Sequence, residues 1–248
     1  MEYNEETEER GLRRVSSKAL KLTTPKLPAC VCMAVDHIGI VFMDNNNIMR
    51  AVGRLAFPVF AFLLVQGLLR TSDVRRYLLR LGIFAVVSEI PFDLAMHDTI
   101  WYPGAQNILF TLTAGLFAIY AMDSRGPIGR WKVEIALAAA LLAEFLRFDY
   151  GMAGVGIIVM FYLIEKERSG ADAYTLAYFN KKQNIEIVVL SSLVYILCLG
   201  MNQLYALLAM IPVNMYSGER GRMKLKYFFY LFYPLHLLLI WFIWKIIH

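Results

Sequence analysis

Cysteine is scarce in this sequence, occurring only at Cys30, Cys32 and Cys198, each time inside an apolar segment. An odd number of cysteines in such places predicts no disulfide framework. Cys30 and Cys32 are two residues apart, so on a helix they point to different sides, and no nearby partner lies at zinc spacing. We therefore expect small buried hydrophobic side chains at these positions and no metal site.

Charge is also sparse, because 18% of the 248 residues are charged whereas 58% are hydrophobic. The mean hydropathy is +0.51, and soluble domains are usually only about 45–50% apolar. The apolar residues gather in blocks between short charged links, and about 20 residues of helix cross a hydrocarbon core of ~30 Å. The sequence therefore predicts an all-α, polytopic membrane protein whose surroundings are the lipid bilayer, without a nucleic-acid partner.

Counting the apolar blocks predicts about nine membrane spans, with eight to ten as the range. The eighth is short and contains Pro212, so we expect it to be tilted or re-entrant. No internal repeat is visible, so the inverted-repeat signature of many transporters is missing. The nine predicted spans are residues 27–43, 51–69, 76–95, 106–122, 131–148, 150–165, 184–200, 203–216 and 227–246.

Residues 1–25 form a polar tail of mixed charge with no apolar core, so no cleavable signal peptide is expected. Lys and Arg concentrate in alternate links: "RTSDVRR" and "SGERGRMKLK" carry several, whereas the other set holds one Arg apart from Arg147. The positive-inside rule then predicts a multi-pass protein of the cytoplasmic membrane. Its tail lies inside, residues 26–248 form the membrane domain, and the C-terminus lies outside.

The first span contains two adjacent titratable residues, Asp36 and His37, in "ACVCMAVDHIGIVFM". An ionisable side chain at that depth costs roughly 3 kcal/mol or more, so it is rarely accidental. Lys26 precedes His37 by eleven residues, which places both on one helix face, about 16 Å apart. Asp36 lies about 100° around the helix, so we expect it to contact another helix, where it could pair with Arg54.

Other spans carry polar residues at a similar depth, in the outer half of the membrane. Glu89 and Asp93 flank Pro91, Asn107 and Thr111 share a helix face, and His236 lies ten residues beyond Lys226. Several polar residues at one depth predict the walls of a polar cavity. The alternative is a network of charges that only holds the helices together. The residues at this level are Asp36, His37, Arg54, Glu89, Asn107 and His236.

Two histidines in such a cavity indicate proton transfer, because the unperturbed pKa of histidine near 6.5 suits a general base. A neighbouring carboxylate would fix the tautomer of the imidazole. Lys26 and other bases at the inner ends suit an anion such as a phosphate-bearing cofactor, or they only set the topology. These features do not by themselves distinguish an enzyme from a proton-coupled transporter.

Several motifs resemble the TraX family, named for the conjugation-system protein that acetylates the pilin N-terminus. They are "AVDHIGIVFM", "MRAVGRLAFPVFAFLLVQG", "YLLRLGIFAVVSEIPFDL", "NILFTLTAG" and "KYFFYLFYPLHLLLI", in order from Lys26 to Ile240. TraX-like proteins are grouped with transmembrane acyltransferases. Acyltransferase family three has a basic residue, ten intervening residues and a histidine in its first helix; Lys26 and His37 reproduce that spacing, with Lys for the more usual Arg.

The resemblance implies transfer of an acetyl group from cytoplasmic acetyl-CoA to an extracytoplasmic acceptor, through an amino or hydroxyl group of a peptide, glycan or lipid head group. His37 would be the general base, and Arg54 or Asn107 would stabilise the oxyanion. His236 would position a substrate, and Asp36 or Glu89 would orient the imidazole. The residues expected to bind the coenzyme A thioester are Lys26, Asn107 and Thr111.

Two other functions stay open on the sequence. A proton-coupled transporter or flippase would use the same buried histidines and carboxylates. A structural or assembly subunit of a secretion or conjugation apparatus would tolerate loss of His37. Whether the acceptor is acetylated on nitrogen or oxygen, and whether the acyl group rests on the protein first, is not encoded in these motifs.

Overall fold

The computed structural model describes residues 26–44, 46–169, 201–214 and 226–248. Within these ranges the chain is helical and forms no strand, apart from an isolated bridge between Gln106 and Phe148. The predicted all-α class is confirmed. The predicted tail and the predicted span 184–200 lie outside the described residues.

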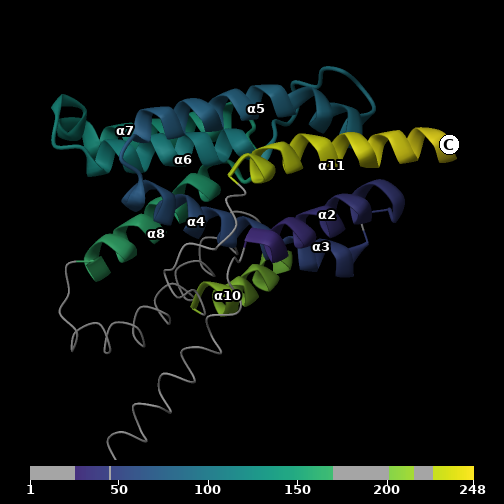
Figure 1. Ribbon diagram of the computed structural model, residues 1–248, viewed down its shortest axis with the longest axis horizontal. Helices are drawn as coiled ribbons and strands as arrows, with labels where there is room; N and C mark the ends of the chain where they lie inside the picture. The colour runs from purple at the N-terminus through teal and green to yellow at the C-terminus, as the bar shows by residue number, and fades with distance from the viewer. Residues whose placement is uncertain (1–25, 45, 170–200, 215–225) are drawn as a thin grey trace, which may run out of the picture.

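Figure 1 shows how the helices pack. Helix α4 lies at the centre and contacts α2, α6 and α8, whereas α5 lies between α11 and α6. Helix α11 also contacts α2, so the first and last described helices are neighbours. The helices are α2 (Lys26–Phe42), α3 (Asn47–Gly53), α4 (Ala56–Arg70), α5 (Val74–His97), α6 (Ile108–Asp123), η1 (Pro127–Trp131), α7 (Lys132–Phe145), α8 (Gly151–Ser169), η2 (Met201–Ala209), α10 (Met210–Asn214) and α11 (Lys226–Ile247).

The helix bounds follow the predicted spans closely, with two differences. The second span is divided into α3 and α4, and the eighth is a 3-10 helix, η2, followed by the short α10. By length and composition, two described stretches suffice to cross a membrane, Asn47–Arg70 and Phe228–Ile247. The count of about nine spans therefore stays a prediction.

The division between α3 and α4 has a local cause. Pro58 has no backbone N–H, so it cannot donate the helical hydrogen bond to the carbonyl of Arg54. The chain turns at Arg54 and Leu55 but keeps right-handed helical dihedral angles there, so α3 and α4 run on in nearly one direction. The break places the guanidinium of Arg54 inside an otherwise apolar stretch.

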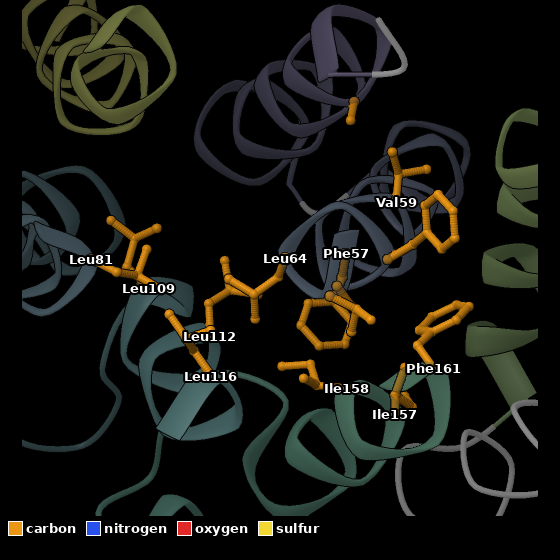
Figure 2. Close-up of a cluster of buried hydrophobic side chains, with 14 of the residues drawn as sticks. Phe57, Val59, Leu64, Leu81, Leu109, Leu112, Leu116, Ile157, Ile158 and Phe161 are labelled. Carbon is orange, nitrogen blue, oxygen red and sulfur yellow. The ribbon is translucent and has the colours of Figure 1, made fainter. Parts of the chain in front are cut away.

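The apolar core lies where α4 meets α6 and α8 (Figure 2). Since lipid is as apolar as these side chains, close van der Waals packing rather than exclusion of water stabilises such a contact in a membrane. All of the labelled side chains are buried: Phe57, Val59, Leu64, Leu81, Leu109, Leu112, Leu116, Ile157, Ile158 and Phe161.

Two glycines of α8 provide a matched test of this packing. A Cβ at Gly154 would lie 2.6 Å from Thr111 Cγ2 and 3.2 Å from Phe57 Cζ, whereas a Cβ at Gly156 would meet nothing within 4 Å. We expect Gly154→Ala to destabilise the protein by about 1–3 kcal/mol through overpacking. Gly156→Ala should be neutral or stabilising, by up to about 1 kcal/mol, because alanine favours the helix. Thermal unfolding in detergent measures both, and equal effects would contradict this packing.

Large apolar side chains also cover the outward faces of α5, α7 and α11. On α11 they follow helical spacing along one side, as lipid contact requires. Together with the two apolar stretches long enough to span, these faces indicate a membrane protein. The exposed large apolar residues of α11 are Phe228, Leu231, Leu235, Leu239, Phe242, Ile243, Ile246 and Ile247.

The ends of α5 and α11 are joined by a polar contact. Asp98 accepts hydrogen bonds from Lys245 Nζ at 2.8 Å and from Trp241 Nε1 at 3.1 Å. These bonds, with that from Lys245 the larger influence, lower the pKa of the Asp98 carboxyl below its usual value. The contact joins the C-terminal end of α11, the helix that carries His236, to the end of α5.

Candidate active site

Two predicted residues 199 positions apart in the chain meet where α2 packs on α11. His37 Nδ1 lies 2.8 Å from His236 Nε2, and the two rings are nearly parallel, at 17°, with centroids 5.0 Å apart. Each histidine is only 8% exposed. The structure therefore brings together a buried pair of imidazoles, one from each end of the described chain.

Aromatic rings enclose this pair. Tyr233 meets His37 edge-on at 6.2 Å and His236 at 5.6 Å, and Phe232 stacks on His236 at 4.8 Å. The hydroxyl of Tyr233 interacts with the backbone N–H of Ile108, at the start of α6. Tyr233 was missed in the sequence, although it lies three residues before His236 in "YPLH" and so shares its helix face.

Asp36 pairs with Arg50, not with Arg54 as the sequence suggested. The Arg50 guanidinium donates to Asp36 Oδ2 at 2.9 Å. Asp36 lies against the α3 backbone at Gly53, where the missing side chain allows α2 to approach closely. Arg50 lies one helical turn before Arg54, within α3, and it also acts electrostatically on His37. The negative charge of Asp36, the residue next to His37, is therefore balanced by Arg50 of the neighbouring helix α3.

Arg54 turns instead toward the α7–α8 connection. It donates a hydrogen bond to the hydroxyl of Tyr150 at 3.3 Å, and Tyr150 stacks on Phe57 at 4.2 Å. Thr111 donates to the carbonyl of Asp149 in the same connection. Two residues predicted for the site thus hold a tight turn, in which Tyr150 has a positive φ of 62°.

Glu89 and Asn107 form a closed buried cluster between α5 and α6. Asn107 is the N-cap of α6, accepting from Leu109 N, and its amide donates to Ala85 O at 2.8 Å and to Glu89 Oε2 at 2.5 Å. Both amide protons are therefore used within the protein, which leaves none for an oxyanion. Nearby, Asp93 accepts from Tyr102 N at 2.8 Å.

Lys26 lies at the start of α2, and its Nζ is 5.2 Å from the centroid of the Phe229 ring on α11. Lys26 and His37 therefore both face α11. Eleven residues of helix separate them by about 16 Å. Among the described residues, no three or more His, Cys, Asp or Glu side chains gather as metal ligands.

A polar hollow of about 610 Å³ lies in the link from α6 to α7 and is lined by basic side chains, Arg125, Arg130 and Lys132 among them. At its edge, Lys166 forms an ion pair with Asp123. The hollow is at the far end of α6 from Asn107, about 24 Å along the helix. It is separate from the histidine pair, and the predicted polar cavity around that pair stays a prediction.

The arrangement provides a buried proton acceptor with the Asp36–Arg50 ion pair on the neighbouring helix. A neutral imidazole has one ring nitrogen with a lone pair that can accept a proton, and exclusion of water strengthens electrostatic interactions with a developing charge. His37 and His236 supply the first function, and Arg50 the second. These three residues suit proton removal from a nucleophile during attack on a carbonyl group.

Comparisons with known proteins match the part of the chain that contains both histidines. A family model described as TraX protein matches residues 21–244. The probable fimbrial assembly protein FimC of Dichelobacter nodosus is 29% identical over 92% of this chain and 96% of that protein. A TraX protein of Escherichia coli is 28% identical over 61% of this chain and 59% of its own length, and another is 30% identical over 52% and 50%. No solved structure matches the chain.

Proposed function

The chain belongs to the TraX family, and from that premise we propose that it is an integral-membrane acetyltransferase of the transmembrane acyltransferase group. It transfers an acetyl group from cytoplasmic acetyl-CoA to an amino or hydroxyl group outside the cytoplasm. The protein is multi-pass, with its N-terminus in the cytoplasm. FimC of Dichelobacter nodosus, which is similar to most of this chain, is named as a probable fimbrial assembly protein, so the N-terminal amine of a surface-fibre subunit is the first acceptor to test.

One observation carries the proposal: the buried contact between His37 and His236, 2.8 Å apart. A buried imidazole pair is costly in an apolar surrounding, and stability alone does not require it. Proton transfer within the membrane, by contrast, uses a titratable group at that depth. The location of the pair on α2 and α11, in two of the motifs typical of the family, supports a shared chemistry.

The transfer step follows from these groups. The acceptor nitrogen or oxygen attacks the carbonyl carbon of the thioester, and His37 takes the proton that the acceptor loses. The carbon–sulfur bond then breaks, coenzyme A leaves as the thiolate, and the proton passes to its sulfur. Arg54 and Asn107 are hydrogen-bonded to Tyr150 and Glu89, so Arg50, whose guanidinium pairs with Asp36 next to His37, is the candidate to stabilise the oxyanion.

The test uses the purified full chain in lipid nanodiscs. Acetyl-CoA should raise its unfolding temperature saturably, and Lys26→Ala should weaken that effect. Acetyl transfer is measured by mass spectrometry on three acceptors: a peptide with a free N-terminus, an amino sugar and phosphatidylethanolamine. A peptide with a blocked N-terminus is the control. A folded protein that shows neither stabilisation nor transfer would contradict the proposal, and flux through sealed vesicles without acetyl-CoA would favour a transporter.

A further inference from the structure

The hydrogen bonds of His236 determine which of its ring nitrogens carries the proton. His236 Nδ1 lies 2.7 Å from the carbonyl oxygen of Phe232. A carbonyl oxygen only accepts, so Nδ1 must carry a hydrogen and donate it. A neutral imidazole has one ring proton, so Nε2 of His236 carries a lone pair and is an acceptor.

The same reasoning extends to His37. Its Nδ1 lies 2.8 Å from the unprotonated Nε2 of His236, so Nδ1 of His37 must be the donor. In neutral His37 the remaining nitrogen, Nε2, then carries the lone pair. The order from the main chain outward is the Phe232 carbonyl, the His236 ring and the His37 ring, with every proton pointing toward the carbonyl.

We infer that Nε2 of His37 is the atom that takes the proton of the acceptor, and that His236 is a positioning residue that holds His37 in the required tautomer. The inference rests on the proposed acetyl transfer. When Nε2 gains the proton, the acceptor loses it and His37 becomes an imidazolium. Its Nδ1–H continues to donate to His236, so no other proton moves.

A carboxylate commonly orients a catalytic histidine, but the nearby carboxylates have other partners. Asp36 is bound by Arg50, and Glu89 accepts from Asn107. The neutral imidazole of His236, which is hydrogen-bonded to the Phe232 carbonyl, takes the place of a carboxylate as the partner of His37. It accepts the Nδ1–H without bringing a net charge into the apolar interior, which lowers the penalty of burial.

The surrounding side chains fix the ring of His236. Phe232 stacks on one face of it at an interplanar angle of 13°, and Tyr233 meets it edge-on. A ring held in this way cannot rotate to exchange its nitrogens, and such rigidity is what a positioning residue requires.

Two replacements of His236 separate its hydrogen bond from its volume. Phenylalanine keeps the ring but has no acceptor, so His236→Phe should lower kcat for acetyl transfer about 10²-fold, with KM for acetyl-CoA within a factor of about three. Glutamine can place an oxygen where Nε2 lies, so His236→Gln should stay within about tenfold of wild type. His248→Phe, at the exposed C-terminus, is the matched control and should keep full activity.

Nitrogen-15 NMR of histidine-labelled protein in nanodiscs provides a measurement independent of activity, with the His37 signals assigned from His37→Asn. Finding His37 protonated on Nδ1 supports the inference, and finding it protonated on Nε2 overturns it. Equal activity loss in the glutamine and phenylalanine variants, with both folded, overturns the positioning function and leaves acetyl transfer intact. A wild-type protein with the Nδ1 tautomer that transfers no acetyl group overturns the proposed function, and the catalytic part of this inference with it.

Discussion

His37→Ala is expected to reduce acetyl transfer by about 10²–10⁴-fold, the range that a positioned general base contributes. Without the imidazole, the acceptor nucleophile must attack the thioester while it still holds its proton. Binding of acetyl-CoA should persist, because the residue expected to bind the anionic donor, Lys26, lies about 16 Å away along α2. The measurement is kcat at saturating acetyl-CoA, together with the thermal shift that the donor produces.

A loss of folding would imitate this result, so the variant needs a matched control. Val31→Ala lies on α2, where Val31 is 56% exposed, and should keep its activity. Added imidazole offers a second control, since it can enter the space left by His37→Ala and restore part of the rate, but not that of a misfolded protein. Activity of His37→Ala within tenfold of wild type would refute the proposed base and favour the assembly-subunit function.

Much of the fold follows from the sequence because lipid imposes a simple requirement. Each apolar block must satisfy its backbone internally, so it forms a helix whose ends lie where charge resumes. The bounds of α2, α5, α6 and α11 therefore lie close to those predicted. The same counting placed His37 and His236 at one depth, because each was measured from a basic residue at the inner end of its helix.

Side-chain partners were less predictable, because they depend on shifts of one helical turn. Arg50 and Arg54 are one turn apart, and the sequence does not say which of them reaches Asp36. Pro58 breaks the helix at Arg54, and Gly53 has no side chain, so α2 packs closely against α3 there. As a result Asp36 lies within hydrogen-bond distance of Arg50. The proline and the glycine were both visible, but their combined effect depends on how α2 approaches.

Asn107 illustrates a signal that was present but given another meaning. An asparagine directly before an apolar helix is a typical N-cap, and "NILFTLTAG" has that form. The depth of Asn107 favoured a site residue instead. In the structure its side chain caps α6 and ties that helix to α5 through Glu89.

Asn107→Ala is accordingly expected to be the most destabilising of these changes, by about 3–5 kcal/mol. The N-cap bond contributes about 1 kcal/mol, and its loss frees the first turn of α6. The larger part arises because the buried carboxylate of Glu89 would lose the side-chain amide donor and keep only the backbone N–H of residue 107, 3.2 Å away, and a buried charged group with fewer donors carries a large desolvation penalty. Unfolding by SDS titration from nanodiscs, and by heat in detergent, measures the loss.

Two further variants identify the cause. Thr113→Val removes an ordinary hydrogen bond to Leu109 O, 2.7 Å long, on the same helix, and should cost about 1 kcal/mol or less. Glu89→Gln keeps an oxygen that accepts from Asn107 and buries no charge, so it should be nearly neutral. If Asn107 bound the donor, its replacement would raise KM for acetyl-CoA in the fraction that remains folded. An unchanged KM with a large loss of stability would identify Asn107 as a structural residue whose hydrogen bonds hold α6 against α5.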